Sequence, residues 1–141
     1  MKKFFTSAIF ICALIFSVTA NAASWLFIGN DELGNEYFLD TSSVEIESKT
    51  DDKLTFYAVF KANFVEDMKA RWNMPNLSYA FHVYRFEKVG DTRRCAVLYT
   101  QYFSADDKII DSAVKPSDWK DVRTGSINET FYDAAAECLN L

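Results

Sequence analysis

The side chains most able to do chemistry in this 141-residue sequence are one histidine, His82, and three cysteines, Cys12, Cys95 and Cys138. A serine or cysteine hydrolase needs a histidine base beside its nucleophile and an orienting acid, and zinc needs several such ligands. Neither a Cys-x-x-Cys pair nor a second histidine is present. We therefore predict no catalytic residue, no metal site and no cofactor, and we interpret His82 as a packed, hydrogen-bonded core residue.

Carboxylates are more plentiful, with 20 acidic residues in the chain. A glycosidase needs only two of them, and the sequence marks no particular pair, so this alternative stays open. Gly29 and Gly34 lack the spacing and the following helix of a dinucleotide-binding loop. The prediction is a non-enzymatic protein.

The first 22 residues have the pattern of a secretory signal peptide. Two lysines follow Met1, an apolar run extends from Phe4 to Val18, and Ala20-Asn21-Ala22 is an Ala-x-Ala cleavage motif. The apolar run is short for a membrane span of about 20 residues, so we favour cleavage over anchoring. We expect residues 1–22 to be removed and residues 23–141 to form one domain, exported to the periplasm, the cell surface or the medium.

Removal of that segment takes away two lysines and leaves 13 basic and 20 acidic residues, a formal net charge of −7. Nucleic-acid binding draws on clustered Lys and Arg, so we predict that nucleic acid is not a partner. Two cysteines remain, and in an oxidising compartment an even pair is most simply one disulfide. A Cys95–Cys138 bond would stabilise the fold by about 4 kcal/mol in the chain-entropy account.

The longest strand-like run extends from Leu77 to Phe103 and turns at Val89-Gly90-Asp91-Thr92, where Gly and Asp suit a type II′ or I′ hairpin. The turn predicts the following register: Lys88 opposite Arg93, Glu87 opposite Arg94, Phe86 opposite Cys95, Tyr84 opposite Val97 and His82 opposite Tyr99. Other strands are expected at 24–29, 36–40, 44–47, 54–60 and 108–112. Residues 65–72 fit a short helix or an ordered loop equally well, and 116–119 resemble one helical turn.

A helix is predicted to open at Ser126, where Ser126-Ile127-Asn128-Glu129 fits a capping box. Residues 127, 131, 134 and 138 then lie along one helical stripe, so Cys138 should face the sheet. The predicted fold is α+β: a single antiparallel β-sheet of about six strands, with the C-terminal α-helix packed on one face and pinned by the disulfide.

Two features of the ribbon suggest contact with another protein chain. The face away from Cys95 carries apolar side chains that are a contact surface or are covered by residues 65–72, Trp25 or Trp119; both readings stay open. The turn end carries four basic residues that could steer an acidic partner, although solvated charges with a Glu87–Arg94 cross-strand pair explain them equally well. These partner-binding candidates are Arg85, Lys88, Arg93 and Arg94.

The chain resembles the surface-adhesin protein E-like family of Gram-negative bacteria. The resemblance covers most of residues 23–141 and is carried by the following features: Trp25, the block from Tyr37 to Val44, Arg93-Arg94-Cys95, Tyr102-Phe103, Trp119, and the block from Gly125 to Glu129 running on to Cys138. It implies the same sheet, helix and disulfide, and a homodimer.

For the family's best-known member the resemblance also implies adhesion to host matrix and plasma proteins such as vitronectin and laminin, through a basic segment that maps onto the four candidates. The expected function is an exported binding module whose partner is a host protein or another envelope protein. The alternative is a soluble periplasmic accessory or inhibitor protein.

Overall fold

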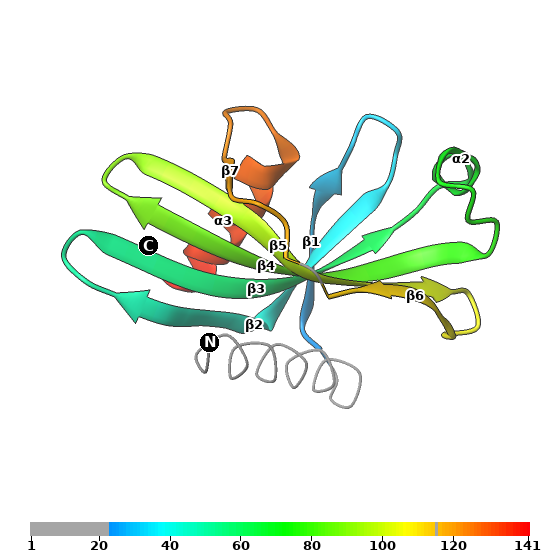
Figure 1. The fold of residues 1–141 in the computed structure, drawn as a ribbon, viewed down its shortest axis with the longest axis horizontal. Coiled ribbons are helices and arrows are strands. Elements are labelled where there is room, and N and C mark those ends of the chain that lie inside the picture. The colour runs from blue at the N-terminus through cyan, green and yellow to red at the C-terminus, as the bar shows by residue number, and fades with distance from the viewer. Residues whose placement is uncertain (1–22, 115) are drawn as a thin grey trace.

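The structure, a computed structural model, describes residues 23–114 and 116–141. These residues form one antiparallel sheet with two helices (Figure 1). The elements are β1 (Trp25–Asn30), β2 (Glu36–Lys49), β3 (Lys53–Asn63), α2 (Glu66–Arg71), β4 (Leu77–Val89), β5 (Thr92–Ser104), β6 (Ile109–Ala113), β7 (Lys120–Asp121) and α3 (Ile127–Cys138).

The strands follow one another across the sheet in the order β1-β2-β3-β4-β5-β6, and the two-residue β7 pairs with the same outer edge of β5 further along. The antiparallel sheet and the C-terminal helix confirm the predicted architecture. The predicted signal peptide, residues 1–22, lies outside the described residues. Among the described helices, none has the length and apolar character that crossing a membrane requires.

The β4–β5 ribbon turns at Gly90, whose φ of +57° at the first turn position is typical of a type II′ hairpin. From the turn to Tyr84 opposite Val97 the register is the predicted one. Beyond that point the prediction of His82 opposite Tyr99 is wrong: His82 pairs with Thr100, and Tyr99 pairs with Val83. Leu98 is the extra residue of a β-bulge in β5. Because side chains alternate between the two faces of a strand, one extra residue moves every later side chain of β5 to the face opposite the predicted one.

A second irregularity lies in β2, where the sequence predicted two strands separated by a turn. β2 is instead one continuous strand that contains a wide bulge. Asp40 pairs with Val59 and Glu45 with Tyr57, so the four residues 41–44 of β2 lie opposite the single residue Ala58 of β3. Ser43 Oγ stabilises this bend by donating to the Asp40 carbonyl oxygen (2.7 Å) and accepting from the Val59 N–H (2.8 Å). The bend therefore replaces the missing ladder bonds with side-chain bonds.

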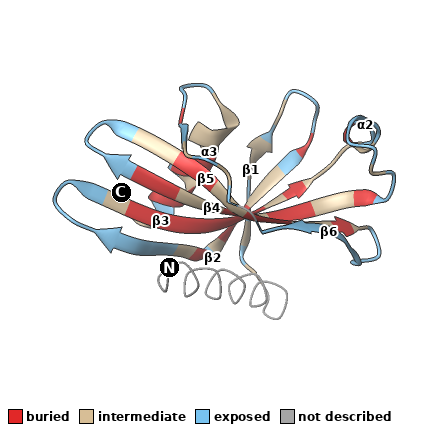
Figure 2. Ribbon diagram, in the orientation of Figure 1, coloured by how far each residue is buried: buried red, intermediate tan, exposed pale blue. Residues whose placement is uncertain are grey.

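The main core lies between α3 and one face of β2 to β5 (Figure 2). Phe131 stacks on Phe60 with ring centroids 4.3 Å apart, and Tyr132 meets Phe56 edge-on at 5.4 Å. Cys95 belongs to this cluster, so the helix covers the predicted face of the sheet. The helix also begins as predicted, because Ser126 Oγ accepts from the Glu129 N–H; the Glu129 carboxylate reaches back to the Gly125 N–H.

The predicted disulfide is not formed in this structure: Cys95 is a buried free thiol and Cys138 is an exposed one. Three members of the expected stripe of α3 do pack on the core: Phe131 is buried, and Ile127 and Ala134 lie against the same cluster. The buried face is wider than predicted, because it also includes Tyr132, Ala135 and Ala136. Cys138, at the last helical position, is exposed, so the expectation that it faces the sheet is wrong.

On the opposite face of the sheet, Val59, Val83 and Tyr99 form a second apolar cluster against which Trp25 and Leu98 pack. The Trp25 ring also stacks on Phe81 with centroids 5.5 Å apart. The sequence left open whether this face contacts another chain or is covered by residues of the same chain. The second reading is confirmed for the middle of the face, which Trp25 of β1 covers.

Two local predictions are also decided. Residues 66–71 form the short helix α2, whereas residues 116–119, predicted as a helical turn, have no helix. The segment runs along the edge of β5 instead: the Ser117 N–H donates to the Val97 carbonyl oxygen (2.8 Å), and the Val97 N–H donates to Ser117 Oγ (2.9 Å). Bonds to the sheet edge satisfy the backbone groups that a helical turn would have paired internally.

Candidate functional site

The four basic candidates do not form one patch, because they lie on both faces of the ribbon. Successive side chains of a strand alternate between faces. Arg85 and Arg94 therefore point away from α3, whereas Lys88 and Arg93, which pair with each other across the ribbon, lie on the α3 side. The sequence spacing alone predicts this split once the hairpin turn is placed.

Arg93 forms ion pairs and a cation–π contact with side chains of α3. Its guanidinium contacts Glu129 (3.0 Å) and Asp133 (3.3 Å) and lies over the Tyr132 ring at 5.2 Å. With Leu54 and the exposed Lys88, it lines a shallow crevice at the C-terminal end of the helix. Arg93 thus ties α3 to the ribbon, and two carboxylates already balance its charge.

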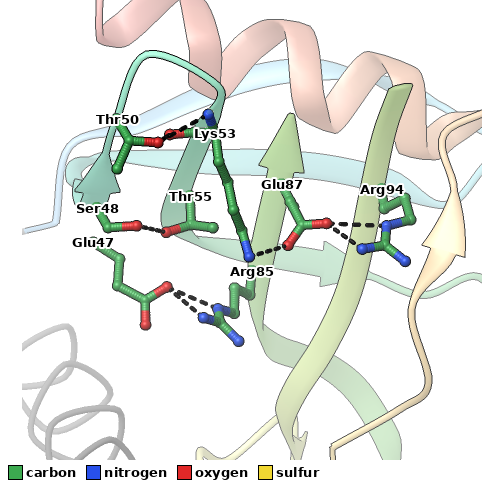
Figure 3. Close-up of polar contacts among 8 residues, drawn as sticks. All are labelled: Glu47, Ser48, Thr50, Lys53, Thr55, Arg85, Glu87 and Arg94. Atoms are coloured by element: carbon green, nitrogen blue, oxygen red, sulfur yellow. Dashed lines mark hydrogen bonds and ion pairs between the residues drawn. The ribbon is translucent and has the colours of Figure 1, made fainter. Parts of the chain in front are cut away.

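The other face carries a set of charged side chains around one buried carboxylate, and we call this surface the arginine face (Figure 3). Its members are Glu47, Lys53, Arg85, Glu87, Arg94 and Trp119. Glu87 is 4% exposed and accepts from Arg94 Nε (3.1 Å), with a second contact to the same guanidinium, and from Lys53 Nζ (3.0 Å). Burial alone would raise the pKa of Glu87, but the hydrogen bonds from Arg94 and Lys53 outweigh it and hold the pKa below its ordinary value.

Arg85 lies in the next row of the same face. Its Nε and one terminal nitrogen both contact Glu47 Oε2 at 2.8 Å. The pKa of Glu47 is lowered, because hydrogen bonds from Tyr57 and Arg85 outweigh the burial that would raise it. Arg85 therefore links the central strand β4 to β2 near the sheet edge.

Trp119 joins the two arginines. The guanidinium carbons of Arg85 and Arg94 each lie 5.4 Å from the centre of its ring, within the range of a cation–π contact. The ring is held there by the Ser117 bonds on one side and by β7, which pairs with Arg94 and Cys95, on the other. The sequence named Trp119 as one possible cover for this face of the ribbon, but it gave no sign of the contacts with Arg85 and Arg94.

His82, the one histidine, lies on the α3 side of β4 and is partly buried. Its Nδ1 is 3.0 Å from Thr100 Oγ1, and the rings of Tyr84 and Tyr102 lie edge-on to it. Burial lowers the pKa of His82 to about 4, so the imidazole is neutral at physiological pH. The interpretation of His82 as a packed, hydrogen-bonded residue agrees with this environment.

Within the described parts of the chain, no group of three or more His, Cys, Asp or Glu side chains is arranged to hold a metal ion. Two shallow clefts on the described surface are the Arg93 crevice and one at the end of the ribbon opposite the Gly90 turn. Comparisons of the chain with protein-family models, with curated proteins and with solved structures found no match.

Proposed function

We propose that this chain is an exported, non-enzymatic binding module that contacts another protein through the arginine face. One observation carries the proposal: Trp119 lies against both Arg85 and Arg94 on the face of the sheet that α3 does not cover. Trp and Arg are the residue types most enriched among the side chains that dominate protein–protein affinity.

The two arginines are also ordered before any partner arrives. Their side chains are 32% and 40% exposed, yet ion pairs with Glu47 and Glu87 and the contact with Trp119 fix their positions. A side chain that is already ordered loses less conformational entropy on binding. Each guanidinium has further N–H donors for a partner, since Arg has five in all.

The resemblance to the surface-adhesin protein E-like family suggests the class of partner. Host matrix or plasma proteins such as vitronectin and laminin, another envelope protein, or a second copy of the chain are the partners that this proposal includes. Surface display is part of the adhesin proposal, and retention in the periplasm belongs to the alternative of an accessory or inhibitor protein.

The test uses residues 23–141 and immobilised vitronectin and laminin, with binding followed by interferometry. Arg85→Ala should weaken binding by at least about tenfold, or about 1.4 kcal/mol. The matched control is Arg93→Ala, which removes the same charge, a similar pair of acidic contacts and a similar aromatic contact from the α3 side. Equal loss in both variants, or no binding by the unmodified chain, would count against the arginine face as an adhesive site.

Cell fractionation tests the compartment independently. Protease accessibility of the chain on intact cells supports surface display. Protection until the outer membrane is opened supports the accessory or inhibitor alternative.

The disulfide between Cys95 and Cys138 belongs to the same proposal, as the oxidised form that export produces. Two facts support it: Cys95 lies in the cluster that packs against α3, and Cys138 is the last residue of that helix. Formation of the bond needs the exposed Cys138 side chain to turn toward the sheet. Thiol counting on the exported, unfolded chain should find no free thiol, and two free thiols would reject the bond.

A further inference from the structure

Tyr57 of β3 lies directly opposite Arg85 across the β3–β4 pair, so both side chains point to the face of the sheet away from α3. The guanidinium carbon of Arg85 is 5.9 Å from the centre of the Tyr57 ring, within the range of about 6 Å for a cation–π contact. Trp119 supplies a second ring at 5.4 Å. Two aromatic side chains from different parts of the chain therefore contact one guanidinium.

Tyr57 also contacts the carboxylate that pairs with Arg85. Glu47 accepts hydrogen bonds from Arg85 and from Tyr57, and Figure 3 shows its carboxylate beside the Arg85 guanidinium. A hydrogen bond to an ionised acceptor is stronger than one between neutral groups. Tyr57 thus touches Arg85 through its ring and Glu47 through its hydroxyl group.

A bulge in β2 sets the position of Glu47. The pairs that Ile46 and Ser48 make with consecutive residues of β3 leave Glu47 as an extra residue between them. Bulges re-aim side chains and are frequent at sheet edges. The β1–β2 register ends at Asp40, so among the described residues Glu47 lies at such an edge. The side chain at this irregular position is the one that meets Arg85 at 2.8 Å.

The two arginines of the arginine face differ in what their carboxylates require. Glu87 is 4% exposed and needs a cation, because an unpaired buried charge is costly. The Glu47 side chain is 27% exposed and reaches water, so its pairing with Arg85 contributes little to stability. Control of the guanidinium therefore explains the contacts around Arg85 better than burial of a charge does.

We infer that Tyr57 is a positioning residue of the arginine face, which acts on a partner only through Arg85. Its ring supports the guanidinium, and its hydroxyl group orients the Glu47 carboxylate that accepts from Arg85 Nε. An arginine that is held before binding loses less side-chain entropy when a partner arrives. Tyr57 itself is only 6% exposed and has little surface to offer a partner. This inference rests on the proposed function and adds a buried residue to it.

The first test needs no partner. Residues 23–141 and their Tyr57→Phe variant, which keeps the ring and loses the hydroxyl group, are compared by NMR. The variant should show a higher pKa of the Glu47 carboxyl group, because the carboxylate has lost one of its donors. It should also show several-fold faster exchange of the Arg85 Nε–H with water. Unchanged exchange at Arg85 would overturn the inference, whatever the pKa of Glu47 does.

The matched control is Tyr99→Phe. Tyr99 is a similarly buried tyrosine on the same face of the sheet, 8% exposed, but it packs in the second apolar cluster. This control should leave the exchange of the Arg85 Nε–H and the pKa of Glu47 unchanged. Equal changes in both variants would show a general loosening of the sheet and would reject a positioning role for Tyr57.

Binding then separates this inference from the proposed function. On immobilised vitronectin and laminin, Tyr57→Phe should weaken binding about fivefold, or about 1 kcal/mol. The double variant of Arg85→Ala and Tyr57→Phe should bind as weakly as Arg85→Ala alone, and a further loss would overturn the inference. Absence of binding by the unmodified chain would reject the arginine face as an adhesive site, while the NMR comparison would still decide whether Tyr57 holds Arg85.

Discussion

Glu87 faces Arg94 directly across the β4–β5 ribbon, and the buried carboxylate of Glu87 receives both Arg94 and Lys53. Residues opposite one another on an antiparallel pair are the unit of sheet stabilisation. Here the unit also neutralises a carboxylate that would otherwise be costly to bury. Arg94 therefore has a structural role in addition to the binding role that we propose for its face.

The first prediction concerns this carboxylate. Arg94→Ala should lower the free energy of unfolding by about 2 to 3 kcal/mol, because Glu87 then keeps only Lys53. Lys53→Ala should cost less than about 1 kcal/mol, since Glu87 then keeps both of its contacts with Arg94. Urea unfolding of both variants measures the difference, and equal costs would show that the two cations are interchangeable.

The second prediction concerns His82 and pH. Its pKa is about 4 in the folded chain and about 6.5 in an unfolded one. The unfolded chain therefore binds more protons between these values, so stability is complete above pH 6.5 and falls as the pH drops toward 4. The loss between pH 6.5 and 4.5 should be about 2 kcal/mol, measured by urea unfolding across that range.

His82→Gln is the control for this slope, because Gln can still bond to Thr100 and has no titrating group. Its stability should fall less between pH 6.5 and 4.5 than that of the unmodified chain. The carboxylates with lowered pKa values, among them Asp31 and Glu87, begin to lose their contribution at the acidic end of this range, and they do so equally in both proteins. A variant with the same slope as the unmodified chain would assign the loss to other groups.

A third prediction concerns Asp31 in the β1–β2 turn. Its carboxylate accepts from the Leu33 and Asn35 N–H groups (3.0 Å each), from Asn35 Nδ2 (2.8 Å) and from Tyr37 Oη (2.8 Å). Asn35 is fully buried, and its Oδ1 accepts from the Val65 N–H just before α2. Asp31→Ala should cost about 2 to 3 kcal/mol, because it leaves the buried Asn35 side chain without one partner.

The neighbouring Glu32→Ala is the comparison for Asp31, because Glu32 is exposed and surface changes usually stay within about 0.5 kcal/mol. Thermal unfolding of the two variants gives the contrast. If Asp31→Ala unfolds at the same temperature as Glu32→Ala, the bonds of the turn contribute nothing net.

The fourth prediction concerns the bend in β2. Ser43→Ala removes the acceptor of the buried Val59 N–H and should cost about 1 to 3 kcal/mol. Amide hydrogen exchange at Val59 should accelerate in this variant more than exchange at Val83. Ser43→Thr keeps the hydroxyl, and it should restore the protection of the Val59 amide.

Local signals in the sequence were enough to predict the hairpin turn, most of the strands and the start of the last helix. Gly90 identifies the hairpin because its positive φ favours glycine, and Ser126 marks the helix because a side-chain oxygen is needed there. From the turn, simple counting gives Glu87 opposite Arg94. These features depend on neighbours in sequence, which a single chain displays.

The errors arose where distant parts of the chain decide the outcome. Nothing near Leu98 marks it as a bulge, so the count from the turn failed at His82. The width of the buried face of α3 depends on which helical side chains pack against Phe56 and Phe60, and the helical spacing did not indicate that Tyr132 is one of them. Trp119 reaches the arginines only because its segment follows the edge of β5, which the spacing of residues does not reveal.

The extra residue in β5 also limits how this chain can change in evolution. Odd-numbered residues of β5 face α3 before Leu98, as Cys95 does, and face the opposite side after it, as Tyr99 does. Loss of a single residue there would return Tyr99 to the helical side and carry every later side chain of the strand with it. Substitutions at Leu98 are therefore easier to accommodate than any change in the length of this strand.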